Sequence, residues 1–189
     1  MPDFKVRWPW IILGIIVLLV LWVVVAYNGL VTSHENVTTQ WANVQAVYQR
    51  RMDLIPNAVS IVKGAANFEK STMLAVTEAR TKWLAGGSSG DEIASAQQFD
   101  SALSRLLVTV ESYPQLKATE AFRDLTTELE GSENRIAVAR RDFNEAVQSY
   151  NLSVKRFPGS MIAGMFGFAP ESFFQADAGS DKAPTVNFQ

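Results

Sequence analysis

The sequence predicts an all-α protein in which an N-terminal transmembrane helix continues into an elongated antiparallel helix bundle. Three observations lead to this fold class. Residues 8–33 form an uncharged, mostly apolar stretch, residues 30–156 carry apolar side chains at steps of three and four, and no alternating strand pattern occurs in that region. About 150 residues remain outside the stretch, which is enough for one ordinary domain with its own core.

The apolar stretch has the length and the flanking side chains of a membrane anchor. Residues 8–30 carry no charge, and about 20 apolar residues cross a hydrocarbon core. A cleaved signal peptide has a shorter core that ends in small residues, so a permanent anchor is favoured over cleavage. Aromatic rings favour the membrane–water interface, and the anchor residues of this kind are Trp8, Trp10, Trp22 and Tyr27.

The few basic residues around the stretch predict its orientation. Lys5 and Arg7 precede it, and the next basic residue is Arg50. The positive-inside rule then makes residues 1–9 a short cytoplasmic N-terminus and residues 10–30 the span. Residues 31–157 would form a bundle on the periplasmic or extracellular side.

Composition excludes several classes of function. The 17 basic and 19 acidic residues give a net charge of −2, so no bulk field attracts nucleic acid, and no nucleic-acid partner is expected. The chain has no cysteine, which excludes disulfides, thiol nucleophiles and thiolate metal sites. Its single histidine, His34, is more simply explained as a packed or interfacial side chain than as a ligand.

The first long helix is expected to bend at Pro56 and to end at the turn of residues 86–90. Proline removes a backbone donor and clashes with the preceding helical turn. The apolar stripe stays nearly in phase across Pro56, which favours a bent continuous helix over a tight hairpin there. The stripe consists of Leu30, His34, Val37, Trp41, Val44, Tyr48, Ile55, Val59, Val62, Ala66, Met73, Val76 and Trp83.

Two further helices are expected, the first from Asp91, an N-cap candidate, to Tyr113, and the second over residues 118–156. Pro114 ends the first of them. The second has large apolar residues at steps of seven with small residues between them, which suits close antiparallel packing. A 40-residue helix reaches about 60 Å, so the bundle should be elongated.

The sequence contains no recognisable catalytic set, and we expect neither an enzyme nor a cofactor. A di-metal bundle needs a Glu-x-x-His pair from each of two helices, and one histidine cannot supply them. Zinc-protease, nucleophile-elbow and phosphate-loop motifs are absent from the sequence. We therefore interpret the apolar stripes at helical spacing as the hydrophobic core of the bundle and not as a binding or catalytic site.

Two charged clusters flank the predicted bend and occupy the last helix. The first comprises Arg50, Arg51 and Asp53, close to Pro56 and Asn57, and the second includes Glu133, Asn134, Arg135, Arg140 and Arg141. Spacing alone favours solvated helix faces with weak pairs. The alternative is that Arg51 lies near the packed seam and is braced by a carboxylate of the last helix, because an unpaired charge near a core is costly.

Residues 158–175 form an apolar segment rich in glycine, methionine and phenylalanine. Such a segment must bury on its own bundle, on a neighbouring copy or in the membrane interface. Its candidate interface residues are Met161, Ile162, Met165, Phe166, Phe168, Phe173 and Phe174. Residues 176–189 are expected to be a flexible tail, in which residues 184–188 resemble a short extended peptide that could add to a partner.

These motifs resemble the LemA family. The resemblance rests on QRRMDLIPNAVSIVKG (Gln49 to Gly64), ELEGSENRIAVARRDFNEAVQSYN (Glu128 to Asn151), FPGSMIAGMFGF (Phe157 to Phe168) and the Pro184-x-Val-x-Phe188 end. It implies an N-terminal anchor, an up-and-down four-helix bundle and a bacterial envelope location, here the inner membrane. It implies no established enzymatic activity. The ten charged-cluster and bend residues named above are implied to be structural or assembly positions.

The expected function is a non-enzymatic, membrane-anchored scaffold that self-associates and organises membrane. The partners are then the lipid bilayer and further copies of the chain. Some members of the family are associated with membrane-protease or stress systems, and a related magnetosome protein acts in membrane invagination. The alternative is therefore an adaptor for other envelope proteins, with the 184–188 tail as its contact.

Overall fold

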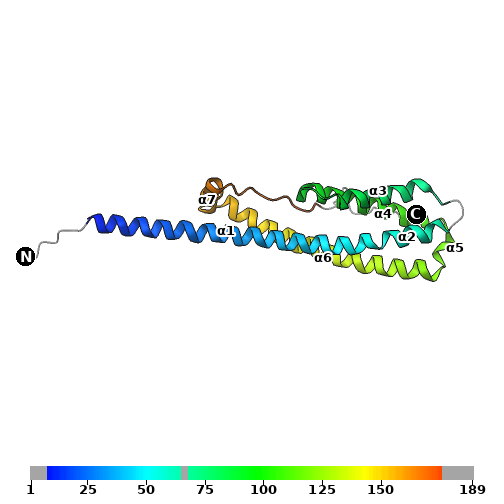
Figure 1. Cartoon of the computed structure of the whole chain (residues 1–189). Helices are drawn as coiled ribbons and strands as arrows, with labels where there is room; N and C mark the ends of the chain where they lie inside the picture. The colour runs from blue at the N-terminus through cyan, green and yellow to red at the C-terminus, as the bar shows by residue number, and fades with distance from the viewer. Residues whose placement is uncertain (1–7, 65–67, 176–189) are drawn as a thin grey trace, which may run out of the picture. The chain divides into compact units, whose positions relative to one another are not determined.

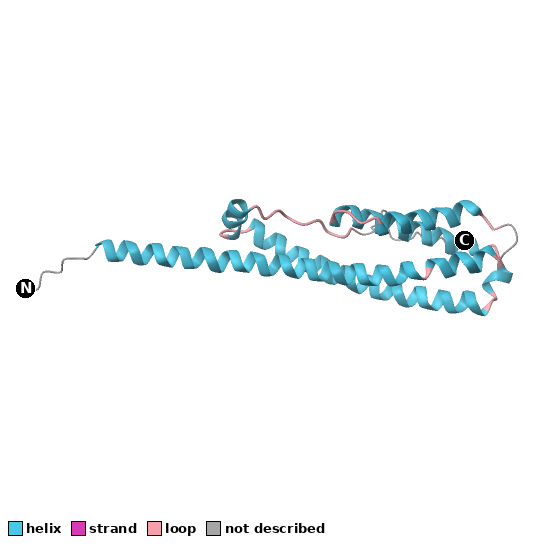
Figure 2. Cartoon of the chain, viewed as in Figure 1, coloured by secondary structure: helices cyan, strands magenta, loops and turns pink. Residues whose placement is uncertain are grey.

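The computed structural model describes residues 8–64 and 68–175, which form α-helices and connecting loops without a strand (Figure 2). This confirms the all-α prediction. The described residues divide into an anchor unit, residues 8–39 and 145–171, and a bundle unit, residues 40–144 and 172–175. The helices in chain order are α1 (Trp8–Asp53), α2 (Ile55–Lys63), α3 (Lys70–Leu84), α4 (Ser89–Val110), α5 (Pro114–Lys117), α6 (Glu120–Lys155) and α7 (Gly159–Phe166).

Helix α1 contributes to both units and runs without interruption through 46 residues (Figure 1). The prediction that the apolar stretch continues into the first bundle arm is therefore confirmed, with no break between Tyr27 and His34. Among the described helices, this one alone is long and apolar enough to cross a membrane, and its most apolar window is exposed. The apolar stretch is accordingly a candidate membrane span.

The bundle unit is an up-down-up-down arrangement of α1 with α2, then α3, α4 and α6. Trp83 near the end of α3 stacks on Tyr48 of α1, with ring centroids 4.9 Å apart. Glu92 near the start of α4 accepts a hydrogen bond of 2.9 Å from Trp41 of α1. Phe143, late in the bundle part of α6, lies 5.1 Å from the Trp41 ring. Helices α3 and α6 therefore run opposite to α1 and α4, and α3 packs along α4 (Figure 1).

Apolar side chains at the predicted spacing fill the interior. The stripe of α6 is buried at Phe122, Leu125, Leu129, Ile136, Phe143, Tyr150 and Val154. The stripe of α4 is buried at Phe99, Leu103, Leu106 and Val110. Burying one such side chain contributes roughly 1.5–3 kcal/mol, so these rows supply the main driving force for helix association.

Near the predicted bend at Pro56, the first long helix is interrupted at Leu54, the one residue between α1 and α2. Leu54 keeps helical backbone angles, and the Ala58 amide donates to its carbonyl at 3.0 Å. Pro56 has no N–H to donate to the Met52 carbonyl four residues earlier. The Arg80 guanidinium of α3 donates to that carbonyl instead, at 3.1 Å. The hydrogen bond that proline removes is thus replaced by a neighbouring helix.

The prediction of one first helix that reaches Trp83 is wrong. Helix α2 ends at Lys63 and α3 begins at Lys70, after which the chain runs back along α1. Phe68 is buried beside Tyr113, with ring centroids 5.1 Å apart. Periodicity could not reveal this reversal, because two antiparallel helices have the same apolar period. The reversal supplies the fourth helix of the bundle.

Two helix boundaries near α4 also differ in detail from the prediction. The N-cap is Ser88 rather than Asp91, which is the third helical residue and completes a capping box. The Ser88 hydroxyl accepts from the Asp91 amide at 3.3 Å, and the Asp91 carboxylate accepts from the Ser88 amide at 3.3 Å. After Tyr113, Pro114 starts the one-turn helix α5, which is too short to show an apolar period in the sequence.

In the anchor unit, α7 and the chain after it pack beside α1 and the end of α6. The Tyr27 ring of α1 lies 4.8 Å from Phe166 and 5.8 Å from Phe168. His34 contacts the Tyr150 ring at 5.2 Å and the Glu171 carboxylate at 3.4 Å. His34 is thus a packed side chain with one acidic neighbour, as expected.

Two glycines hold α7 in place. A Cβ at Gly159 would collide with the Ser153 carbonyl oxygen of α6, so the start of α7 approaches α6 too closely for any side chain. Gly167 ends α7 with φ of 77°, a left-handed conformation that favours glycine.

Candidate functional site

Five side chains from three helices form an ion cluster inside the bundle unit. Its members are Tyr48 and Arg51 of α1, Asp100 of α4, and Glu133 and Arg140 of α6. Tyr48 and Arg51 lie one helical turn apart, and Glu133 and Arg140 lie two turns apart. Each pair therefore projects from one face of its helix.

Asp100 is the centre of the ion cluster. Its Oδ1 lies 3.1 Å from Nη1 of Arg51, and its Oδ2 accepts a hydrogen bond of 2.7 Å from the Tyr48 hydroxyl. Nη2 of Arg140 contacts both that carboxylate and the Tyr48 oxygen. Arg51 also reaches Oε2 of Glu133 at 2.6 Å. Arg51 thus pairs with a carboxylate of the last helix, the contact that the bracing hypothesis requires, and with Asp100 of α4.

Burial governs the electrostatics of the ion cluster. Arg51 is 7% exposed. Burial raises the pKa of Asp100, while Arg140, the Tyr48 hydroxyl and Arg51 act in the opposite direction. Burial and the Asp100 charge raise the pKa of Tyr48 far above its ordinary value, which favours the protonated phenol. Two guanidiniums against two carboxylates leave the cluster without net charge.

Aromatic rings line the Arg140 side of the ion cluster. The Arg140 guanidinium lies 4.3 Å from the centroid of the Phe174 ring and 5.5 Å from that of Tyr48. A cation over a ring face gains about 0.5–2 kcal/mol, with the larger values in desolvated sites. The cluster thus ties three helices and the C-terminal segment together, and its groups bind one another.

The remaining charged and bend positions predicted from the sequence lie outside the ion cluster. Arg50, Asp53, Pro56, Asn57, Asn134, Arg135 and Arg141 are exposed. Asp53 accepts a hydrogen bond of 2.9 Å from Gln49, and Arg141 pairs with Asp142 at 3.1 Å. These contacts are within one helix, as solvated faces would make.

Sequence reasoning missed Tyr48 and Asp100 as members of the ion cluster. Tyr48 belongs to the predicted apolar stripe, and its ring is buried there. Asp100 carried a usable signal, because it stands one residue after Phe99 and three before Leu103, on the buried face of α4. An acidic residue at a core position requires a buried partner.

Two asparagines of α6 hold the segment after α7 by its backbone. In the anchor unit, Asn151 donates to the Glu171 carbonyl and accepts from the Glu171 amide, both at 2.8 Å. In the bundle unit, Asn144 makes the same pair with Phe174, at 2.9 and 2.8 Å. Seven residues advance a helix by about 10.5 Å and three advance an extended chain by about 10 Å, so the two spacings agree.

The candidate interface residues divide into buried and exposed sets. Ile162 and Phe174 are buried within the chain itself, and Phe168 is half-buried. The exposed set is Met161, Met165, Phe166 and Phe173. Among the anchor aromatics, Tyr27 is half-buried under α7, whereas Trp8, Trp10 and Trp22 are exposed along α1. The predicted tail at residues 176–189 lies outside the described residues.

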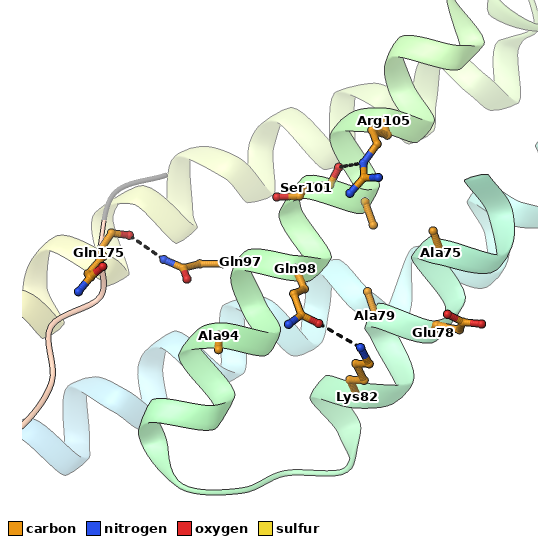
Figure 3. A pocket seen from close by; sticks show the side chains of 11 residues that line it. Ala75, Glu78, Ala79, Lys82, Ala94, Gln97, Gln98, Ser101, Arg105 and Gln175 are labelled. Atoms are coloured by element: carbon orange, nitrogen blue, oxygen red, sulfur yellow. Dashed lines mark hydrogen bonds between the residues drawn. The ribbon is translucent and has the colours of Figure 1, made fainter. Parts of the chain in front are cut away.

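A groove of about 710 Å³ lies between α3 and α4 in the bundle unit (Figure 3). Lys82 donates to Gln98 at 3.3 Å across it, and Gln97 donates to the Gln175 carbonyl at 3.2 Å. Its other walls are mainly alanine, with Ser101 and Arg105 at one end. Within the part of the chain that the structure describes, no group of three or more acidic or histidine side chains is placed to hold a metal ion.

Comparison with known proteins gives a consistent set of relatives. The magnetosome proteins MamQ 1 and MamQ 2 of Paramagnetospirillum magneticum are each 26% identical to the chain over 181 residues, covering 82% of it. The protein LemA of Metamycoplasma hominis is 26% identical over 152 residues, covering 79% of this chain and 68% of its own. The chain spans 66% of the length of the MamQ relatives.

The names of these relatives describe no enzymatic activity. The sequence profile of the LemA family matches residues 40–188, which is most of the chain and includes the ion cluster, both asparagines and α7. The chain belongs to the LemA family.

Proposed function

We propose that the protein is a non-enzymatic scaffold that α1 anchors in a membrane and that associates with further copies of itself. The observation that carries this proposal is α1, in which the candidate span and the first arm of the bundle are one uninterrupted helix. Such a helix holds a folded unit at a membrane without a flexible linker.

The ion cluster supports a structural role rather than a catalytic one. Its charged groups are paired with one another, and a buried acid held between two guanidiniums does not exchange protons readily with a substrate. Removing one member of such a cluster is expected to loosen the bundle. Its contribution is then to the alignment of α1, α4 and α6.

The proposed location is the inner membrane of a bacterial cell. Residues 1–9 would face the cytoplasm, residues 10–30 would span the bilayer, and the bundle would lie on the other side. The basic residues Lys5 and Arg7 ahead of the span support this orientation.

Self-association is tested by the mass of the full-length protein in detergent. Size-exclusion chromatography with light scattering, corrected for bound detergent, should give a multiple of 20.9 kDa that persists on dilution. A protein mass of one copy at every concentration would contradict the self-association part of the proposal. The same measurement after exchange into lipid nanodiscs checks that detergent has not dissociated the copies.

An adaptor for envelope proteins is the alternative function. Its predicted contact, residues 184–188, lies outside the described residues, and no described contact favours it over a scaffold. Deleting residues 184–188 should therefore leave the mass in detergent unchanged, whereas an adaptor would lose a co-purifying partner.

A further inference from the structure

We propose that α7 is a second membrane-contacting element, whose outer face lies in the interfacial layer of the bilayer that α1 crosses. This inference rests on the anchoring part of the proposed function and adds a second contact to it. The occupant of the exposed α7 face is then lipid, at the boundary between headgroups and acyl chains. Three features of the anchor unit carry the inference: the level of α7 along α1, the distribution of its side chains and the charges beside it.

The level of α7 is fixed by the ring of Tyr27. Phe166 and Phe168 contact this ring at 4.8 and 5.8 Å. Tyr27 ends the aromatic and aliphatic run of α1, three residues before residue 30, where the predicted span ends. A tyrosine at that position of a spanning helix lies at the membrane–water interface. The end of α7 therefore lies at the same depth as the interface.

The side chains of α7 are divided between two faces. Ile162 and Ala163 are each 2% exposed and pack on the anchor unit. Met161 and Met165 lie four residues apart on α7 and are exposed to 58% and 72%, and Phe157, in the turn before the helix, is exposed to 78%. Residues at this spacing share one side of a helix. The outer face is thus apolar, and no charged residue occurs from residue 157 to residue 170.

Charges beside α7 fit a lipid surface better than a second copy of the chain. Lys155 ends α6 and Arg156 follows it in the turn before α7, and both are exposed. Basic residues next to an apolar helical face are typical of helices that lie in a membrane interface, where they meet lipid phosphates. Exposed methionine and phenylalanine side chains at this depth lose their contact with water without needing a protein partner.

Site-directed spin labelling tests the inference on the full-length protein. The chain has no cysteine, so single variants carry one label each. Leu18→Cys reports on the span, Met165→Cys on the outer face of α7, and Thr39→Cys on an exposed position of α1 twelve residues beyond Tyr27. All three are reconstituted into phosphatidylethanolamine–phosphatidylglycerol vesicles. Collision with oxygen and with a water-soluble nickel chelate then gives the depth of each label.

We expect a deep label at residue 18, a label about 5–10 Å below the headgroup boundary at residue 165, and a water-exposed label at residue 39. If residue 165 is as accessible to the chelate as residue 39 while residue 18 is deep, the inference is wrong and the anchor stands. If residue 165 is shielded from both oxygen and chelate, protein covers α7, and the inference is equally wrong. A water-exposed label at residue 18 would overturn the anchoring proposal itself.

Discussion

Arg51 is the residue on which the packing around the bend depends. It lies three residues before Leu54, where α1 passes into α2, and it reaches carboxylates of two other helices. A guanidinium can serve two acids at once because its donors fan out in one plane. The lysine ammonium is a compact charge without the planar fork of donors, so the geometry of the ion cluster favours arginine at this position.

Replacing Arg51 with methionine should lower the free energy of unfolding by about 3–5 kcal/mol. Methionine keeps the apolar stem but leaves Asp100 with Arg140 as its sole cationic partner in the ion cluster. Urea unfolding of the full-length protein in detergent measures the change. Arg50→Met, at the exposed neighbouring position, is the matched control and should change stability by less than about 0.5 kcal/mol. Equal stability of the two variants would show that the ion pairs of Arg51 do not stabilise the bundle.

Asn151 decides whether the segment after α7 stays on α6. Asn151→Asp keeps an acceptor for the Glu171 amide but loses the donor to the Glu171 carbonyl and places a charge in a buried position. We expect this substitution to lower the free energy of unfolding by about 1–3 kcal/mol. Amide hydrogen exchange at residues 168–175 should become faster. Asn134→Asp, exposed on the same helix, should leave that exchange unchanged; if both variants behave alike, the asparagine contact does not hold the segment.

At the scale of elements, α7 depends on a close approach that glycine alone permits. Gly159→Ala places a methyl group against the Ser153 carbonyl oxygen, so α7 must move away from α6. The prediction is faster hydrogen exchange across residues 159–166. Gly164→Ala in the same helix meets nothing within 4 Å and should stabilise α7 by up to about 1 kcal/mol. Slower exchange in the Gly159 variant than in the wild type would refute the close approach.

The start of α4 should respond to acid through its capping box. Hydrogen bonds from the Ser88 side chain and backbone lower the pKa of Asp91. The folded state therefore binds this proton less readily than the unfolded chain. The stabilisation is present above the unfolded pKa of about 3.9 and is lost as the pH falls through the lower folded value.

Thermal unfolding of the wild type and of Asp91→Asn measures this dependence. The difference in melting temperature between the two proteins should be largest near neutral pH and should decrease as the pH falls below about 4. Ser88→Ala removes the hydroxyl that hydrogen-bonds the Asp91 carboxylate. This variant should lose the same pH-dependent contribution to the melting temperature. A difference that stays constant from neutral to acid pH would show that the Asp91 carboxylate is not the capping group.

The helices of this chain were predictable from sequence because their apolar period is regular, as the buried row Leu129, Ile136 and Phe143 illustrates. The reversal between α2 and α3 was not, because periodicity carries no direction. Asp100 could not be paired with Arg51 before the bundle placed α4 beside α1. The asparagine contacts were also hidden, because a side chain that binds backbone needs no complementary residue in the sequence.

At the scale of the whole molecule, one helix serves both as the candidate anchor and as the first arm of a folded bundle. Its apolar stretch carries no charge over residues 8–30, and its later turns supply Tyr48 and Arg51 to the ion cluster. The LemA family assignment covers the bundle and α7. Together these features support the proposal that the protein is an anchored scaffold.

Electron microscopy of the full-length protein in lipid bilayers tests the scaffold most directly. We predict particles that contain several copies in a reproducible number, with the apolar part of α1 in the bilayer. Arg51→Met should weaken such particles, and Arg50→Met should not. Isolated single copies at every protein-to-lipid ratio would contradict the central claim that the protein is a self-associating scaffold.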